Sequence, residues 1–300
     1  AKLLHGIPHV ATTHSLEPLR PWKAEQLGGG YALSKFCERS GLEGADAIIA
    51  VSEQMRRDVL ACYPAIEPDR VTVIHNGIDP GEYSPDHGTD VWERLGLDPA
   101  RPSVIFVGRI TRQKGLVHLL EAARDIDPAA QLVLCAGAPD TPDIGAEVRA
   151  LVDELSRRRG GVTWIERMLD RPDVIQLLSH ATVFACPSIY EPFGLVNIEA
   201  MACEAAVVAS AVGGIPEVVV DGETGFLVAF EPGSDAFGSP ADRDGFARAL
   251  AERINVLIAD PDLAQRMGQA GRERVLERFS WSAIAAQTAG LYTELIAGSD

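Results

Sequence analysis

The stretch SIYEPFGLVNIEAMA, residues 188–202, decides the fold of this chain. The apolar run 182–186 before it is typical of a short buried strand, and after Gly194 the apolar residues recur at helical spacing. The stretch therefore predicts a strand, a loop and the start of a helix. Glu191 precedes a proline, which disfavours the α region and places this glutamate in the loop, whereas Glu199 lies just over one turn inside the helix.

This loop is expected at the carboxyl end of a parallel strand, where open α/β sheets bind ligands. The free backbone amides of Gly194, Leu195 and Val196 would begin the helix there and suit an anion. Two glutamates also suggest the acid–base pair of a glycosidase. However, the helix N-terminus favours an ionised Glu199, and ionised carboxylates are better suited to binding sugar hydroxyls. The alternative is a solvated loop acid beside an ordinary acid in the first turn of a helix.

Composition bounds the protein class. The 300 residues, 46% of them hydrophobic, suffice for two domains with buried cores. A net charge of −16 argues against nucleic acid or an anionic membrane surface as a general partner. The five cysteines are scattered, and there is neither a membrane-spanning apolar run nor a signal peptide. We therefore expect a cytoplasmic protein without membrane insertion. The sequence leaves open whether the protein forms a homo-oligomer.

Strands and helices alternate along the chain, which predicts parallel sheets in two doubly wound, Rossmann-like domains. The first set comprises strands 7–13, 47–51 and 71–74 with helices 31–42 and 53–63. Residues 80–102, rich in proline, glycine and acids, are predicted to be a linker with a short helix near 91–95. The second set comprises strands 103–107, 131–135, 162–165, 182–186, 206–209 and 225–228, and helices 115–124, 144–158, 172–180, 195–203, 241–258, 261–278 and 281–297.

The segment GRITRQKG, residues 108–115, is a basic loop between a buried strand and a helix. It places three cations within six residues of an otherwise acidic chain. Arginine offers a planar fork for phosphate oxygens and lysine a point charge, so the loop favours a phosphate-bearing ligand. A solvated basic loop is the alternative. The segment is not a Walker loop, because the GxxxxGK[ST] pattern is missing.

Other motifs are weaker taken singly. His14 ends the first strand, and a lone histidine is more often structural than catalytic. HNGID, residues 75–79, contains a turn signal found in any protein. In GGIPE, residues 213–217, the glycines either allow close approach of the backbone to a ligand or form only a tight turn. The Asp-x-Asp patterns at 125–127 and 242–244 lie at helix edges and read as caps, and no metal site is predicted.

Taken in order, His14, HNGID, GRITRQKG, EPFGLVNIE, GGIPE and DGETGFLV resemble the motifs of retaining glycosyltransferases of family 4. That family has the GT-B fold, in which two Rossmann-like domains face each other. Residues 13–36, THSLEPLRPWKAEQLGGGYALSKF, resemble the branch of actinobacterial-type glycogen synthases and maltose-1-phosphate synthases, which use ADP-glucose. The family's first strand and Gly-rich loop have no counterpart here, so the chain is expected to be N-terminally incomplete.

The resemblance implies a division of the chain and an activity. Residues 1–80 would be the C-terminal half of the acceptor-side domain, residues 81–280 the donor-binding domain, and residues 281–300 a helix crossing back to the first domain. Glucose would pass with retention, without a metal or other cofactor, from a nucleotide diphosphate sugar. ADP-glucose is the favoured donor, and the acceptor is an α-1,4-glucan end or glucose 1-phosphate.

The resemblance also implies roles for single residues. The catalytic set is His14, Arg109, Lys114 and Glu191, and donor binding adds Gly108, Gly194, Leu195, Val196 and Glu199. Arg109 and Lys114 would bind the diphosphate, Glu191 the sugar hydroxyls and Glu199 the ribose. His14 would polarise the sugar from the opposite domain.

On the acceptor side the resemblance implies Asn76, and the loop after the strand that ends at His14 adds Arg20 and Lys23, two cations in an otherwise acidic chain. Arg20 and Lys23 would bind the phosphate of glucose 1-phosphate, unless they only fix their loop by pairing with Glu17 and Glu25. Three alternatives to the whole assignment stay open. They are a family 4 transferase with a UDP- or GDP-sugar donor and a different acceptor, a non-catalytic glycan- or nucleotide-binding fragment, and a glycosidase.

Overall fold

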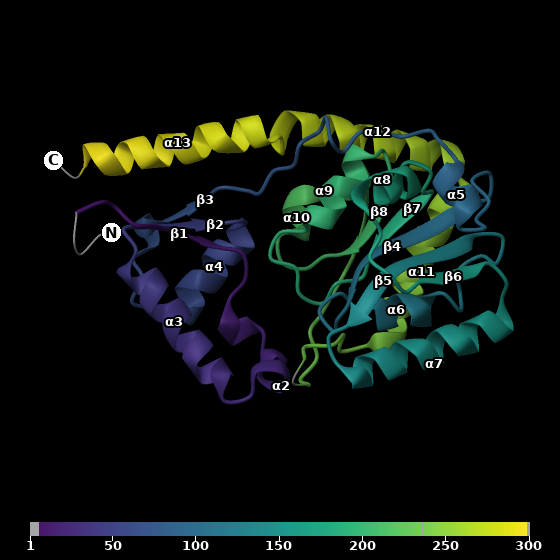
Figure 1. Cartoon of the computed structure of the whole chain (residues 1–300), viewed down its shortest axis with the longest axis horizontal. Coiled ribbons are helices and arrows are strands. Elements are labelled where there is room, and N and C mark those ends of the chain that lie inside the picture. The colour runs from purple at the N-terminus through teal and green to yellow at the C-terminus, as the bar shows by residue number, and fades with distance from the viewer. Residues whose placement is uncertain (1–5, 236, 299–300) are drawn as a thin grey trace. The chain divides into compact units, whose positions relative to one another are not determined.

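The computed structural model describes residues 6–235 and 237–298, without the side chains of Glu25 and Gln26. These residues form two compact units, 6–77 with 279–298, and 78–278 (Figure 1). Each unit contains one parallel sheet with helices in the connections between strands. The predicted α/β class with parallel sheets is therefore confirmed. Among the described residues, no helix combines the length and the apolar character needed to cross a membrane.

The first unit has a three-stranded sheet in the order β1-β2-β3. Its strands are β1 (Val10–Thr13), β2 (Ala47–Ala50) and β3 (Val71–Val73), and its connecting helices are α2 (Lys23–Leu27), α3 (Gly30–Gly44) and α4 (Glu53–Cys62). Ser52 caps α4, since its hydroxyl accepts a hydrogen bond from the Met55 amide. The polar loop after β1 contains a 3₁₀ turn, η1 (Glu17–Leu19), which the sequence did not reveal.

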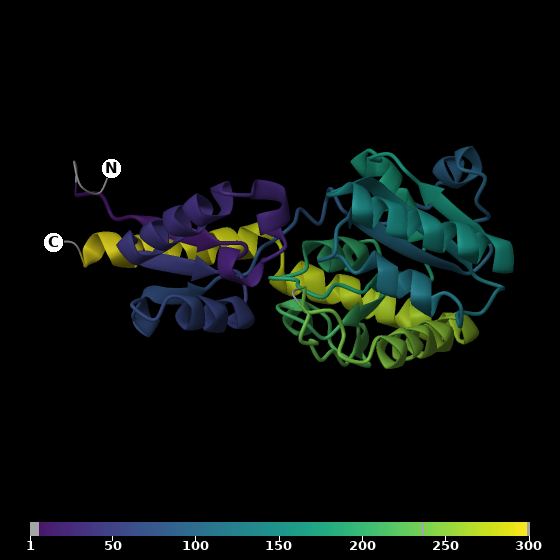
Figure 2. The ribbon, with the colours of Figure 1, turned by 90° about the horizontal axis from the view of Figure 1, so that it is seen from below.

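The last helix, α13 (Trp281–Ala297), belongs to the first unit although it ends the chain. Its buried Ile284 packs with Ile49 of β2 and with Ile74, which follows β3. Figure 2 shows α13 running alongside the strands of this unit. The contact of Ile284 therefore joins the two segments of chain that build the unit.

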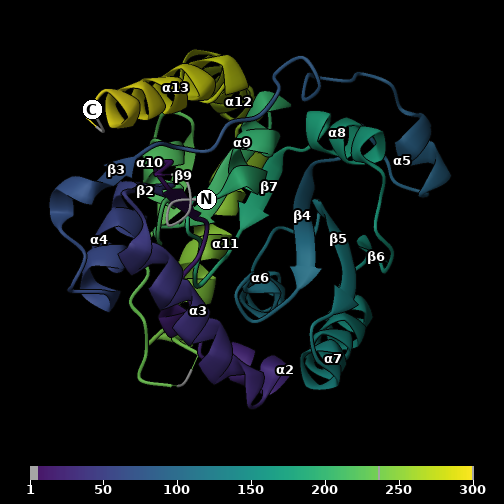
Figure 3. The ribbon, with the colours of Figure 1, turned by 60° about the vertical axis from the view of Figure 1, so that its left-hand side comes forward.

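The second unit has a six-stranded parallel sheet in the order β6-β5-β4-β7-β8-β9. Its strands are β4 (Ser103–Ile110), β5 (Gln131–Pro139), β6 (Val162–Ile165), β7 (Val183–Cys186), β8 (Ala206–Ser210) and β9 (Gly225–Val228). Figure 3 looks onto β4, β5 and β7, which run in the same direction. The chain winds outward from β4 to β6 and then from β7 to β9, so the winding reverses between β4 and β7. Ligands of open α/β sheets bind beyond the carboxyl ends of the strands at such a reversal.

Helices cover both faces of this sheet, because right-handed crossovers place consecutive helices on one side until the winding reverses. One layer contains α6 (Leu116–Ala122), α7 (Pro142–Arg158) and α11 (Arg243–Ala259), with α6 packed against the other two. The other layer contains α8 (Arg171–Ser179), α9 (Leu195–Ala202) and α12 (Pro261–Arg278), with α9 packed against its two neighbours (Figure 1). A short helix, α10 (Ile215–Val218), follows β8.

The segment predicted as a linker packs into the second unit. Its helix α5 (Asp90–Arg94) carries Trp92, which is fully buried and donates a hydrogen bond from its indole nitrogen to the Gln176 carbonyl. The Gln176 side chain in turn accepts from the Val91 amide at 2.7 Å. The polar composition of this segment concealed its role, although Val91, Trp92 and Leu97 are all buried.

Shortening Ile284 to alanine should lower the free energy of unfolding of the first unit by about 2–4 kcal/mol, since a buried branched side chain leaves a cavity. Urea titration followed by amide hydrogen exchange in β2 and β3 measures the change. Ile296→Ala is the matched control on the same helix, because Ile296 is 65% exposed and its loss should cost less than about 0.5 kcal/mol. Equal effects of the two substitutions would contradict the packing described for α13.

Candidate functional site

Three loops meet at the carboxyl edge of the second unit's sheet. They follow β4 (residues 111–115), β7 (187–194) and β8 (211–214). The Ile189 amide donates to the Gln113 carbonyl at 2.9 Å, and the Gly214 amide donates to the Glu191 carbonyl at 3.0 Å. Backbone hydrogen bonds thus tie the β7 loop to both neighbours.

Two glycines are required by this close approach. Gly115 has φ +64°, and a Cβ there would lie 1.9 Å from the Pro187 carbonyl oxygen. Gly213 has φ +54°, and a Cβ there would lie 1.9 Å from the Glu191 carbonyl oxygen. The sequence suggested that the glycines of GGIPE admit a ligand or a tight turn. The structure shows that Gly213 admits the backbone of the neighbouring loop.

Lys114 and Glu191 form an ion pair at this meeting point, with 2.7 Å between Nζ and Oε2. Their side chains are 23% and 10% exposed, so the solvated-acid interpretation of Glu191 is wrong. Burial by itself disfavours the ammonium, but the Glu191 carboxylate outweighs it and raises the pKa of Lys114. The Ser188 hydroxyl also donates to Oε2, at 3.3 Å. Glu191 Oε2 therefore has two protein partners.

Arg109 lies apart from this pair. The register of β4 shifts between Gly108 and Ile110, and the Arg109 side chain is 62% exposed. Its guanidinium donates to Asp140 Oδ1 at 2.8 Å. Sequence reasoning missed Asp140, although its place directly after β5, at the same edge of the sheet, is a usable signal.

Glu199 lies in the first turns of α9 and accepts a hydrogen bond from the Tyr83 hydroxyl at 3.1 Å. The Arg171 guanidinium lies over the Tyr83 ring, 5.7 Å from its centroid. Burial raises the pKa of Glu199, and the Tyr83 hydrogen bond opposes this rise. The expectation that the helix N-terminus dominates and favours an ionised Glu199 is therefore corrected. No local signal could identify Tyr83, which precedes Glu199 by 116 residues.

The helix α9 begins as predicted, directly after Gly194. This glycine has φ +104°, and a Cβ there would lie 2.6 Å from the side-chain nitrogen Nδ2 of Asn197. Leu195 and Val196 are the first helical residues, and amides in the first turn of a helix have no acceptor within it. An anion at the end of β7 would find these donors.

The remaining predicted residues belong to the first unit. His14 is exposed and follows β1 directly, and Asn76 is half-buried between β3 and Gly77. After β1, Lys23 Nζ pairs with Glu17 Oε1 at 2.8 Å, and the Arg20 guanidinium donates to Ser15 Oγ at 2.9 Å. The predicted alternative of a Lys23–Glu17 pair is thus present, whereas the Glu25 side chain lies outside the described residues.

The Asp-x-Asp patterns act as turn and cap residues. Asp242 accepts from the Gly245 amide at the start of α11, and Asp127 accepts from the Ala129 amide. Within the part of the chain that the structure describes, no three His, Cys, Asp or Glu side chains are grouped as a metal site.

Comparison with known proteins assigns this architecture. Residues 92–274 match the family described as Glycosyl transferases group 1, and residues 1–82 match the one described as Glycosyltransferase Family 4. This chain is a group 1/family 4 glycosyltransferase. The resemblance stated from the motifs is confirmed, and so is the enzyme class.

Individual relatives extend over nearly the whole glycosyltransferase chain. It is 56% identical over 302 residues to the Alpha-maltose-1-phosphate synthase of Mycolicibacterium smegmatis, covering 99% of this chain and 76% of the relative. The protein of that name from Mycobacterium tuberculosis is 53% identical, with the same coverage. Among solved structures, a sucrose-phosphate synthase from Thermosynechococcus elongatus superposes with a TM-score of 0.75 at 35% identity, over 96% of this chain and 68% of that one.

Replacing Lys114 or Arg109 should lower the activity of the glycosyltransferase, because each substitution removes a positive charge near the point where the winding of the sheet reverses between β4 and β7. Each alanine variant is expected to lower kcat by about 10²–10³-fold, as loss of one preorganised electrostatic contact does. Initial rates with a nucleotide sugar measure this, with Arg124→Ala as control. Arg124 is 43% exposed and 3.4 Å from Glu154 on the helical face, so its loss should change kcat less than about twofold. Rates near wild type for both site variants would show that neither cation acts on the reaction.

Replacing Tyr83 by phenylalanine should weaken donor binding and change its pH dependence. Because burial already raises the pKa of Glu199, loss of the hydroxyl that favours its carboxylate raises this pKa further. The donor KM should increase as pH falls through the Glu199 pKa, and in Tyr83→Phe this increase should begin at a higher pH, with kcat little changed. Tyr292→Phe, on the exposed surface of α13, should leave the profile unaltered. Superimposable profiles for wild type and Tyr83→Phe would refute the coupling.

Proposed function

We propose that this glycosyltransferase transfers glucose from ADP-glucose to glucose 1-phosphate with retention of configuration, and that an α-1,4-glucan end is its second acceptor. The identity of 56% to a protein named Alpha-maltose-1-phosphate synthase carries the proposal. Maltose 1-phosphate is glucose 1-phosphate with a second glucosyl group, so the name of this relative supports transfer of a glucosyl group to glucose 1-phosphate. The structural neighbour is named a sucrose-phosphate synthase, so its name also refers to a phosphorylated sugar.

The site in the second unit supports a nucleotide-sugar donor. The Lys114 ammonium, held by Glu191, would lie where negative charge develops on a departing diphosphate, and such preorganised charge is usually the largest single contribution to catalysis. Glu191, held by Lys114 and Ser188 through one oxygen, offers the other to sugar hydroxyls. Glu199 would bind the ribose. Arg109 would exchange Asp140 for the diphosphate when the donor binds.

The reaction forms a bond from the glucosyl C1 to an acceptor hydroxyl oxygen and breaks the bond from C1 to the diphosphate. The acceptor proton passes to the departing nucleoside diphosphate, so no protein nucleophile is needed. His14 is proposed to act on the sugar and Asn76 on the acceptor. In this scheme rate enhancement comes from placing the two substrates in register and from stabilising the leaving group.

Turnover of the full-length protein against a panel of substrates tests the proposal. ADP-, UDP- and GDP-glucose are each combined with glucose 1-phosphate or glycogen, and products are identified by NMR with their anomeric configuration. ADP-glucose with glucose 1-phosphate should give α-configured maltose 1-phosphate at the highest kcat/KM. Transfer confined to UDP- or GDP-glucose would favour the related transferase with another donor. Donor binding without turnover would favour a non-catalytic binding protein.

Chelation should not affect the proposed reaction. The Asp-x-Asp residues serve as caps and turns, and the charge that would meet the diphosphate is that of Lys114 and Arg109. Rates measured with and without EDTA should agree. A rate that falls on chelation and returns with magnesium or manganese would contradict the assigned mechanism.

The expected cytoplasmic location also remains part of the proposal.

Arg20 and Lys23 should distinguish the two acceptors. Glucose 1-phosphate carries nearly two negative charges at neutral pH, whereas a glucan end has none. Arg20→Ala and Lys23→Ala are each expected to raise KM for glucose 1-phosphate by about tenfold or more, while KM for glycogen stays unchanged. Arg57→Ala, an exposed change on α4, is the control. If the Lys23–Glu17 pair only fixes the loop, the substitutions will raise KM equally for glucose 1-phosphate and for glycogen. That result would contradict the acceptor assignment.

A further inference from the structure

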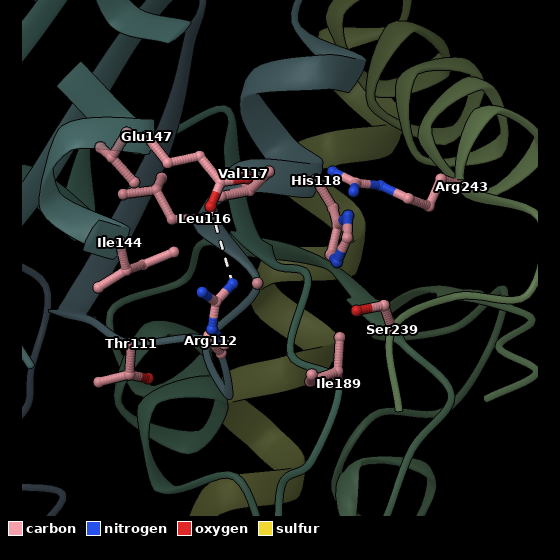
Figure 4. Close-up of a pocket in the computed structure, with 12 residues that line it drawn as sticks. Thr111, Arg112, Leu116, Val117, His118, Ile144, Glu147, Ile189, Ser239 and Arg243 are labelled. Carbon is pink, nitrogen blue, oxygen red and sulfur yellow. Dashed lines mark ion pairs between the residues drawn. The ribbon is translucent and has the colours of Figure 1, made fainter. Parts of the chain in front are cut away.

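A pocket lies in the second unit beside the basic loop (Figure 4). Its walls come from the loop after β4, the first turns of α6 and α7, the loop after β7, the start of α11 and the segment preceding α11. None of the residues assigned to donor binding or catalysis lines it. The lining residues used below are Thr111, Arg112, His118, Glu147, Ser239 and Arg243.

The charge of this lining is opposite to that of the chain. It contains two arginines and one histidine against a single glutamate, in a protein whose net charge is −16. The helices α7 and α11, each of 17 residues, begin at the pocket, but the acids Asp143 and Asp244 in their first turns and the cap Asp242 offset the positive ends of their dipoles. The two arginines are therefore the groups that would bind an anion here.

Arg112 has unused hydrogen-bonding capacity. Its guanidinium lies 3.7 Å from Glu147 Oε2, which is longer than a charge-assisted hydrogen bond, and it stacks on the Phe237 ring at 4.4 Å. Figure 4 shows Arg112 and Glu147 pointing toward each other across the pocket. The stacking fixes the plane of the guanidinium without consuming its N–H donors.

The opposite wall is fixed by Glu121, which lies outside the pocket. It accepts from Arg243 at 2.6 Å and lies 3.3 Å from His118 Nδ1. His118 is 5% exposed and packs edge-on against Phe246. Glu121 thus orients the Arg243 guanidinium and the His118 imidazole, and both side chains line the pocket.

We propose that this pocket binds a small phosphorylated sugar as a ligand separate from donor and acceptor. The phosphate would bridge Arg112 and Arg243, each of which offers a planar fork. The hydroxyls of Thr111 and Ser239, and the Glu147 carboxylate released from Arg112, are suited to sugar hydroxyls. Apolar side chains of the lining, Leu116, Ile144 and Ile189, would pack against the ring carbons.

The ligand would act on donor binding through one short turn. Arg112 and Lys114 lie two residues apart in this turn, which is closed by hydrogen bonds from the Lys114 amide to Thr111 and from the Gly115 amide to the Arg112 carbonyl. Arg112 faces the pocket and Lys114 faces Glu191. A ligand that immobilises Arg112 therefore restricts the loop that carries Lys114, and lowers the KM for the donor.

Calorimetric titration tests binding without requiring turnover. Glucose 6-phosphate and inorganic phosphate are titrated into the protein in excess ADP, which occupies the donor site. Arg112→Gln combined with Arg243→Gln should weaken glucose 6-phosphate binding by about tenfold or more. Arg124→Gln with Arg158→Gln removes the same charge from exposed pairs with Glu154 and should leave the affinity unchanged. Ser239→Asp, which breaks no ion pair, should also abolish binding and covers the case in which the double variant misfolds.

The kinetic arm uses the same variants. Glucose 6-phosphate should lower the donor KM of the wild type at least about twofold and have no effect on Ser239→Asp. Three results would overturn the proposal. They are glucose 6-phosphate binding that ADP abolishes, equal weakening in the pocket and control double variants, and an unchanged affinity in Ser239→Asp.

Discussion

The ion pair between Lys114 and Glu191 is the interaction on which the site depends. It joins the loops after β4 and β7, the two strands between which the winding of the sheet reverses. Two charges are taken largely out of water here, and removing one partner of a buried pair typically costs about 3–5 kcal/mol. Such a pair is retained when it fixes a geometry. In this protein it fixes a cation and a carboxylate where an anionic, hydroxyl-rich ligand would meet the sheet.

Backbone contacts make that geometry possible. The pair can form only if the loops approach closely, and this requires a missing Cβ at Gly115, facing the Pro187 carbonyl, and at Gly213, facing the Glu191 carbonyl. The two glycines therefore determine the positions of Lys114 and Glu191 in the absence of any ligand. A motif such as GGIPE carries a constraint of the protein's own packing in addition to any contact with substrate.

Much of the second unit could be predicted from sequence because its strands and helices have strong periodicity. The helix 261–278 and the start of α9 were placed correctly, as was the helix 281–297 of the first unit. The meeting of the basic loop with Glu191 follows from the parallel topology. Contacts between distant segments could not be predicted. Tyr83 reaches Glu199 from a segment that looked like a linker, and burial, which no local pattern reports, reverses the expected pKa shift of Glu199.

The basic loop also explains why its three cations differ. Lys114 is drawn toward Glu191, Arg109 is turned outward to Asp140 by the irregular end of β4, and Arg112 faces the helical layer. The register shift at Arg109 and the hydrogen bonds of the turn 111–115 give the three side chains different directions. A sequence cluster of like charges therefore divides, on folding, into a buried cation, an exposed cation and a cation directed to the pocket. Each has a separate electrostatic environment, which the spacing of the charges in the sequence does not show.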